Sequence, residues 1–370
     1  MTPNRTERIG PSYAGNNLVN LVAELERRLS GHSPTRGLRR DLSALIPAAR
    51  NYLLVVFDGL GAGQLPHANA SALAESRRAV LEAPFPTTTT VGLSSICTGL
   101  TPLQHGVIGY RQWMPDIQKV VSLLRWTDLS GQHVRYDTAS FLPAPNLWER
   151  LSARQARGMI VQPAAFIDTP LTRMLYRGAE MRGYSSPLEV DPAYLFTMPK
   201  RTLAMVYYHA VDVAAHEAGQ PSESYDVAMS GADQLWARLA DRLPTDTVMV
   251  GTSDHGHSDI PEVGKLILEK SDTEGLRWSG DSRALMLSGP SDRIRDLSEK
   301  TGSRMVGADV LRAWLGRGQP HPDLEARMPD ALLLARDNTG IFPKGMDARK
   351  TGHHGGLTPA EVQSPLLIHQ

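Results

Sequence analysis

Several features that mark secreted, membrane or disulfide-stabilised proteins are scarce in this sequence. The 370 residues include one cysteine, Cys97, which excludes an internal disulfide, and its apolar neighbours favour a small buried hydrophobic residue. No run of about 18 apolar residues occurs, so no transmembrane helix and no membrane partner are expected. The opening residues MTPNRTERIG lack the apolar core of a signal peptide. We therefore expect a cytoplasmic protein.

An excess of charge of one sign is also missing. Lys+Arg and Asp+Glu both total 39, which removes any general electrostatic reason to expect a nucleic acid polymer as partner. The sequence is 41% hydrophobic and 21% charged, as globular proteins are. At this length we expect a single α/β domain over residues 1–370 that carries inserted segments.

The distribution of apolar residues predicts alternating strands and helices. Short apolar runs typical of buried parallel strands occupy residues 51–58, 203–209 and 247–253. Apolar residues at helical spacing occupy residues 18–29, before Gly31, and residues 146–155 and 222–243. This order predicts a mostly parallel central sheet flanked by helices. Residues 110–200 and 260–334 separate the runs by more than a crossover requires, and we expect them to form a cap over the site.

Acids and histidines follow the predicted strands, and the carboxyl ends of strands are where open α/β sheets bind ligands. These candidates are Asp58 in VVFD, Asp212 and His216 in DVAAH, Asp254 and His255 in SDHG, and His353 and His354 in HHGG. Asp212 and His216 are four residues apart and face the same side of a helix. Asp254 and His255 can share an ion if the backbone turns sharply, which Gly256 permits.

Each of these candidates has an ordinary structural alternative. A strand-ending Asp before Gly is commonly a turn or helix cap, and paired histidines in a glycine-rich loop are often exposed. His209 lies among apolar residues, which favours a core or supporting role. Together, however, the four segments supply three Asp and three His, enough for two divalent ions with open positions.

The segment FPTTTTVGLSSICTGLTPLQHGVIGY, residues 85–110, predicts a loop that enters a helix, so that a threonine hydroxyl lies near a helix N-terminus. With VVFDGLG, DVAAH, TSDHG and HHGGLTP in the same order, this segment resembles the type I phosphodiesterase/nucleotide pyrophosphatase branch of the alkaline phosphatase superfamily. The resemblance spans about residue 51 to residue 357. It implies an alkaline-phosphatase-like fold and a hydrolase of phosphoric esters.

The resemblance also implies a role for individual residues. The family's nucleophile falls on Thr89, and one metal would be held by Asp58, Asp254, His255 and the Thr89 oxygen. The second metal would be held by Asp212, His216 and His354, because the family pattern selects the histidine before glycine. His353 is then a supporting or exposed residue. Three imidazoles favour zinc at both sites, with manganese as the alternative.

Two positions depart from the family pattern. Gly92 replaces an asparagine that often holds a phosphate oxygen, and Thr90 replaces an aromatic residue that stacks on a nucleotide base in some members. We expect the space left by Gly92 to accept the second substituent of a phosphodiester. The expected partner is thus a small phosphate ester, a nucleotide or nucleotide sugar among the candidates, and the sequence does not determine the oligomeric state.

Rival functions receive different support. Cys97-Thr98-Gly99 lacks the proline and arginine of a sulfatase motif, and phosphoglycerate mutases use serine where Thr89 stands. A phosphomonoesterase of the same superfamily remains the alternative, and a non-catalytic metal-binding relative is a less favoured one. The expected function is a zinc-dependent phosphodiesterase or nucleotide pyrophosphatase that acts through a phosphothreonine intermediate.

Overall fold

The computed structural model of the chain describes residues 10–370. The opening segment in which we expect no signal peptide therefore lies outside the described residues, apart from Gly10. Among the helices of residues 10–370, none combines the length and the hydropathy that a bilayer-spanning segment requires.

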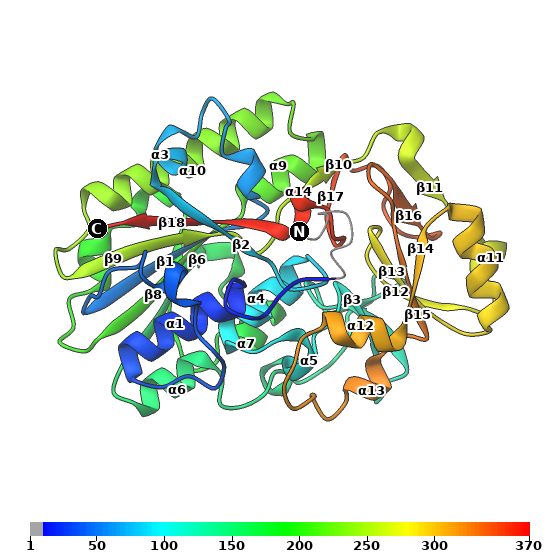
Figure 1. Cartoon of the computed structure of the whole chain (residues 1–370), viewed down its shortest axis with the longest axis horizontal. Coiled ribbons are helices and arrows are strands. Elements are labelled where there is room, and N and C mark those ends of the chain that lie inside the picture. The colour runs from blue at the N-terminus through cyan, green and yellow to red at the C-terminus, as the bar shows by residue number, and fades with distance from the viewer. Residues whose placement is uncertain (1–9) are drawn as a thin grey trace, which may run out of the picture.

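A seven-stranded sheet forms the centre of the molecule (Figure 1). Its strands, in spatial order, are β2 (Arg77–Glu82), β18 (Gln363–His369), β9 (Thr247–Thr252), β1 (Asn51–Phe57), β8 (Thr202–Tyr208), β6 (Arg157–Pro163) and β7 (Glu180–Tyr184). The five strands from β9 to β7 run parallel, and β18 pairs antiparallel with both of its neighbours. All seven residues of β1 are buried, which is why this strand has no polar alternation in the sequence.

Helices cover both faces of the central sheet. On one face α1 (Leu18–Ser30), α4 (Thr89–Thr98), α6 (Leu147–Ala153) and α7 (Pro170–Leu175) pack against alternate strand residues such as Leu54 and Val56. On the other, α3 (Ser71–Ser76), α9 (Ala210–Ala218) and α10 (Glu223–Asp241) pack against Leu53 and Val55. Figure 1 shows these two layers above and below the sheet. Helix α1 ends at Gly31, whose φ of 77° terminates it as the sequence predicts.

A second, antiparallel sheet of seven strands lies beside the first. Its order is β14 (Arg304–Gly307), β15 (Ala331–Leu334), β13 (Ala284–Ser288), β12 (Arg277–Gly280), β3 (Arg111–Met114), β4 (Lys119–Ser122) and β5 (Thr127–Asp128). Helix α11 (Ser291–Thr301) contributes Ile294 to one apolar cluster of this sheet, and α12 (Ala308–Trp314) contributes Leu311 to another.

Short elements complete the structure. Two small sheets pair β10 (Ser258–Asp259) with β17 (Gly352–His353) and β11 (Lys265–Ile267) with β16 (Gly340–Phe342). The remaining short helices are α2 (Arg40–Ser43), α5 (Pro102–His105), α8 (Pro192–Leu195), α13 (Leu324–Arg327) and α14 (Pro359–Val362).

This architecture confirms the predicted fold class, a mostly parallel central sheet with flanking helices and inserted segments. The region 110–200, expected as a cap, divides between the two sheets. Strands β3, β4 and β5 belong to the second sheet, whereas β6 and β7 extend the central one. The reason is that β6, although interrupted by Gly158 and Gln162, is buried at every position and pairs in parallel with β8.

Candidate active site

Three aspartates, of which Asp58 and Asp254 are buried and Asp212 is half-buried, meet at the carboxyl ends of the central strands. Asp58 directly follows β1, Asp254 lies two residues after β9, and Asp212 is in the first turn of α9, which follows β8. Because β8, β1 and β9 are adjacent and parallel, their ends deliver these carboxylates to one edge of the sheet. The backbone N–H of Asp58 donates to the Tyr208 carbonyl at 2.8 Å, which holds this end of β1 in register with β8.

Thr89 is the first residue of helix α4, as the sequence predicts for a hydroxyl near a helix N-terminus. Its Oγ1 lies 3.1 Å from His255 Nε2, and the residue is 8% exposed. The preceding Thr87 ties this segment to the C-terminal glycine loop, since its hydroxyl donates to the Gly356 carbonyl at 2.8 Å and accepts from Gly355 N–H at 3.1 Å. The threonine segment and the HHGG segment are thereby positioned together.

Three histidines direct their Nε2 atoms towards the aspartates. His255 Nδ1 faces the Gly256 carbonyl at 3.2 Å, His216 Nδ1 faces the Gly352 carbonyl at 2.7 Å, and His354 Nδ1 faces the Thr87 carbonyl at 3.0 Å. A carbonyl only accepts, so each Nδ1 is the donor, and in the neutral form of each ring Nε2 is then an acceptor.

These acceptor nitrogens converge with carboxylate oxygens. His216 Nε2 lies 3.1 Å from His354 Nε2 and 3.6 Å from Asp212 Oδ1. His255 Nε2 lies 3.4 Å from Asp58 Oδ1 and 3.6 Å from Asp254 Oδ2. Two neutral imidazole acceptors that face each other cannot form a hydrogen bond, whereas a cation between them satisfies both.

The electrostatics of the carboxylates also favour bound cations. Burial raises the pKa of Asp58 well above its usual range, and the neighbouring Asp254 and Asp212 charges raise it further. Burial likewise raises the pKa of Asp254. Asp58 Oδ1 and Asp254 Oδ2 are buried without a hydrogen-bond partner among the described residues. For Asp212, burial is outweighed by His216, His257 and His354, which hold its pKa well below the usual value.

Two groups of side chains can each hold a metal ion, because their ligand atoms lie within 4.8 Å of one another. The first group consists of Asp58, Asp254 and His255. The second consists of Asp212, His255, His257 and His354, so His255 belongs to both. His257 was not among the site residues predicted from the sequence. Its Nε2 donates to Asp212 Oδ1 at 2.7 Å, and its ring is buried. The pattern His-Gly-His at residues 255–257 could have indicated His257, since a turn that directs His255 to the site also brings the imidazole two residues later close to it.

Two glycines act differently from the sequence-based expectation. A Cβ on Gly92 would lie 2.7 Å from Asp254 Cβ, so this glycine lets α4 pack directly on the Asp254 segment. It leaves no space for a substrate substituent, and that expectation is wrong. Gly256 has no positive φ; it is required because a Cβ there would lie 2.0 Å from the Ala360 carbonyl oxygen. Thr90 is fully buried and donates to the Gly109 carbonyl at 3.1 Å, so it offers no stacking surface.

A buried ion pair supports the segment that carries His354. Arg283 and Glu361 are both fully buried and form two parallel hydrogen bonds of 3.0 Å. Glu361 also accepts from Gly356 N–H at 2.8 Å. Arg283 lies just before β13, so the pair connects the C-terminal loop to the second sheet. His353 is buried rather than exposed, with Nδ1 3.1 Å from Ser282 Oγ and Nε2 3.1 Å from the Lys350 carbonyl.

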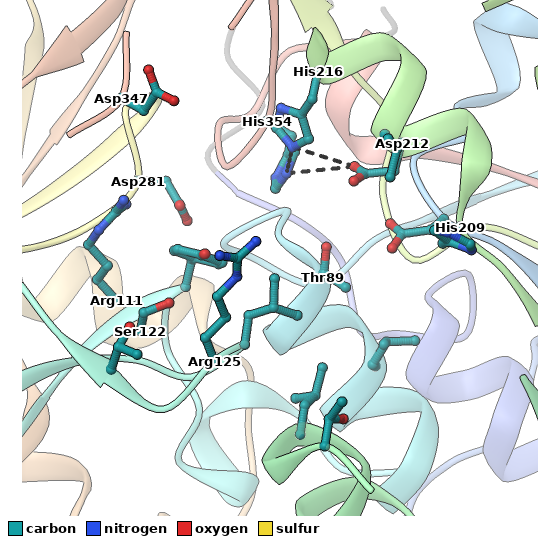
Figure 2. Close-up of a pocket in the computed structure, with 18 of the residues that line it drawn as sticks. Thr89, Arg111, Ser122, Arg125, His209, Asp212, His216, Asp281, Asp347 and His354 are labelled. Carbon is teal, nitrogen blue, oxygen red and sulfur yellow. Dashed lines mark hydrogen bonds and ion pairs between the residues drawn. The ribbon is translucent and has the colours of Figure 1, made fainter. Parts of the chain in front are cut away.

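A cavity of about 720 Å³ opens over Thr89 between the two sheets. Asp58, Asp212, His216 and His354 line one side. Figure 2 shows Asp212, His216 and His354 on the same side of the cavity as Thr89. The opposite side is formed by the second sheet and includes two arginines, Arg111 and Arg125. The cavity is therefore large enough for a small molecule and joins a nucleophile candidate, an anionic ligand set and two arginines on the opposite wall.

Comparisons with known proteins agree with this architecture. The family model for type I phosphodiesterase/nucleotide pyrophosphatase matches residues 52–356. The structure is similar to murine ectonucleotide pyrophosphatase/phosphodiesterase 5, with 18% identity, coverage of 86% of this chain and 88% of the murine chain, and a TM-score of 0.64. An inactive form of the murine protein in complex with AMP gives 17% identity, 86% and 87% coverage and a TM-score of 0.63.

A bacterial structure is similar to the same extent. Phosphonoacetate hydrolase from Sinorhizobium meliloti 1021, in complex with phosphonoacetate, has 16% identity, coverage of 87% of this chain and 91% of the other, and a TM-score of 0.63. At these identities the likeness shows the fold. No curated protein sequence gives a significant match.

The fold and the grouped carboxylates and imidazoles define a metal-dependent hydrolase of phosphoric esters. The chain belongs to the type I phosphodiesterase/nucleotide pyrophosphatase family, because the family model covers most of its length. The resemblance found in the sequence motifs is thereby confirmed.

Proposed function

We propose that this protein hydrolyses a phosphodiester or pyrophosphate linkage of a small molecule through a phosphothreonine intermediate on Thr89, at a site for two zinc ions. The observation that carries the proposal is the contact of Thr89 Oγ1 with His255 Nε2 at 3.1 Å, at the start of a helix and beside the buried carboxylates. A hydroxyl in this position can attack phosphorus while the helix N-terminus stabilises the phosphate charge.

The residues fit two divalent cations. We assign one to Asp58, Asp254, His255 and Thr89 Oγ1, and the other to Asp212, His216 and His354. The orphaned carboxylate oxygens and the facing imidazole acceptors support this assignment. Three imidazoles favour zinc over manganese. Bound ions of this kind lower the pKa of a hydroxyl or water and neutralise charge on phosphate oxygens.

His257 has a supporting role in this proposal. Its Nε2 donates to Asp212 Oδ1 at 2.7 Å, so the ring fixes the orientation of that carboxylate. Tyr207 acts similarly, because its hydroxyl donates to Asp58 Oδ2 and leaves Oδ1 without a protein partner.

The reaction proceeds in two displacements. Thr89 Oγ1 forms a bond to phosphorus as the bond to the leaving oxygen breaks, and the leaving group departs with a proton as an alcohol or a phosphate. Water then attacks the phosphothreonine from the vacated side and restores the threonine hydroxyl. Two inversions give overall retention at phosphorus, which a chiral phosphorothioate substrate can report.

The decisive experiment compares variants of helix α4. Thr89→Ala removes one hydroxyl, and we expect kcat/KM for an aryl phosphodiester to fall by at least about 10³-fold while zinc binding and folding persist. Thr98→Ala is the matched control, because it removes a hydroxyl from the far end of the same helix, where it donates to the Ser94 carbonyl. Wild-type turnover by Thr89→Ala would contradict the nucleophile assignment. Mass spectrometry of rapidly quenched protein should locate the phosphoryl group on Thr89.

Phosphomonoester hydrolysis is the second candidate, and a specific observation favours it. Monoester dianions require additional positive charge, and the second sheet brings Arg111 and Arg125 to the cavity. The ratio of kcat/KM for phenyl para-nitrophenyl phosphate to that for para-nitrophenyl phosphate separates the two functions, because it reports differential stabilisation of the two transition states. We expect a ratio above one at equal zinc loading; a clear preference for the monoester would leave the phosphatase function standing.

A further inference from the structure

The wall of the cavity opposite the aspartates carries two unpaired cations. Arg111 belongs to β3 and Arg125 to the turn between β4 and β5, and both line the cavity. Neither guanidinium forms an ion pair or hydrogen bond within residues 10–370. Figure 2 shows the side chain of Arg125 directed into the cavity towards Thr89, and that of Arg111 beside Asp281.

The backbone around Arg125 is anchored although its side chain is exposed. Leu123 is fully buried, and its N–H donates to the Tyr110 carbonyl at 3.0 Å. Trp126 is 1% exposed, stacks on Tyr136 with ring centroids 5.0 Å apart, and has a φ of 53°. A large residue adopts this left-handed conformation only where its surroundings enforce it. The turn therefore presents Arg125 to the cavity from a fixed point.

Arg111 is held in place by aromatic packing. Its guanidinium carbon lies 5.0 Å from the centroid of the Tyr110 ring and 5.9 Å from that of Trp278. These contacts orient the side chain without using its N–H donors. The nearby Asp281 is buried, and burial raises the pKa of its carboxyl to about 6 against the lowering effect of Arg111. Asp281 thus offsets part of the Arg111 charge, and Arg125 remains uncompensated.

The other carboxylates close to this wall already have partners. Asp128 pairs with Lys119 at 2.8 Å, and Asp347 pairs with Arg349 at 2.9 Å. Neither carboxylate therefore serves as the counter-ion of Arg125. A guanidinium with five N–H donors and no acceptor inside a small-molecule cavity is suited to a phosphate or carboxylate of the ligand.

We infer that Arg125, assisted by Arg111, forms a subsite for a second anionic group, phosphate or carboxylate, that is carried by a substituent on the reacting phosphorus. The inference rests on the proposed function for the location of the reacting phosphoryl group. Thr89 and the ligand set lie on the central-sheet side, whereas both arginines come from the second sheet, so the cations face the substituent across the cavity. The substrate class narrows to diesters with an anionic substituent and to pyrophosphate linkages.

The test uses three para-nitrophenyl phosphodiesters that differ in the second substituent, which is phenyl, para-carboxyphenyl or para-phosphonophenyl. Affinity is measured by calorimetry on zinc-loaded Thr89→Ala protein, and kcat/KM on zinc-loaded protein with Thr89 intact. In both backgrounds Arg125→Gln and the double variant Arg111→Gln/Arg125→Gln are compared with Arg295→Gln. Arg295 is an exposed residue of α11, remote from the cavity, and this control removes the same charge.

We expect a charged ester to bind about tenfold more tightly than the phenyl ester, as one charge-assisted contact allows, and the double variant to abolish this preference. The carboxylate and phosphonate arms identify which anion the subsite takes. Equal affinity for all three esters, or a preference that survives in the double variant, would overturn the inference. A selective loss of para-nitrophenyl phosphate turnover in Arg125→Gln would also overturn it, because the arginine would then serve the reacting phosphoryl group. Absence of diester turnover despite the binding preference contradicts the proposed function alone.

Discussion

The buried pair Arg283–Glu361 allows a quantitative prediction about how the two sheets hold the site. Substituting Arg283 by methionine keeps most of the side-chain volume and removes the charge. Glu361, which is fully buried, then retains the Gly356 N–H at 2.8 Å and the Thr358 hydroxyl at 2.6 Å but loses its counter-ion. Burial favours the neutral carboxyl, and Arg283 holds the pKa of Glu361 below its usual value. Removing Arg283 therefore leaves an uncompensated buried charge.

Breaking such a pair costs about 3–5 kcal/mol of unfolding free energy. For a chain of 370 residues this corresponds to a Tm lower by roughly 4–6 °C. Glu361→Gln preserves one acceptor oxygen but leaves Arg283 unpaired, although Arg283 still donates to the Arg336 carbonyl at 2.6 Å. We expect a similar loss in that variant. The double variant Arg283→Met/Glu361→Gln removes both charges, so its loss should be smaller than the sum by about 1–3 kcal/mol.

Urea unfolding of zinc-loaded protein, followed by circular dichroism, measures this double-mutant cycle. Arg295→Met, which removes an exposed arginine of α11, should change stability by less than about 0.5 kcal/mol. Zinc affinity provides a second readout, because His354 lies in the loop that Glu361 holds. Additive losses within about 0.5 kcal/mol would refute the argument that the two side chains act as one buried pair.

Two further predictions concern histidines in different surroundings. His354→Ala should lower zinc stoichiometry more than His353→Ala, because His354 Nε2 faces the proposed ions whereas both His353 nitrogens are hydrogen-bonded within the protein; equal losses by metal analysis would contradict the ligand assignment. Burial lowers the pKa of His105 to about 3, so its contribution to stability is present above the unfolded value near 6.5 and is lost as the pH falls towards 3. When the pH is lowered from 7.5 to 5, the unfolding free energy of His105→Gln should therefore fall by about 2 kcal/mol less than that of the wild type. Parallel pH profiles of the two proteins in urea unfolding would exclude a contribution of His105 to the pH dependence of stability.

Much of the architecture could be predicted from the sequence because it depends on local patterns. Strands β1, β8 and β9 are apolar at nearly every position, and this is visible in residues 51–58, 203–209 and 247–253 without knowledge of their partners. Asp58 and Asp254 were identifiable as site candidates because strand ends in such sheets coincide at one edge. The helix that starts at Thr89 was likewise indicated by its loop and threonine run.

The tertiary structure alone decided features that depend on contacts between distant segments. Gly92 and Asp254 are 162 residues apart, so nothing near Gly92 in the sequence indicated that the helix packs against the aspartate instead of leaving space. The division of residues 110–200 required the pairing of β6 with β8, and the hydrogen bond from His257 to Asp212 required β9 and α9 to meet. In the sequence, nothing distinguishes Arg125 from an ordinary exposed arginine. Only the packing of the two sheets against each other places it opposite Thr89, because long-range packing determines which surfaces enclose a cavity.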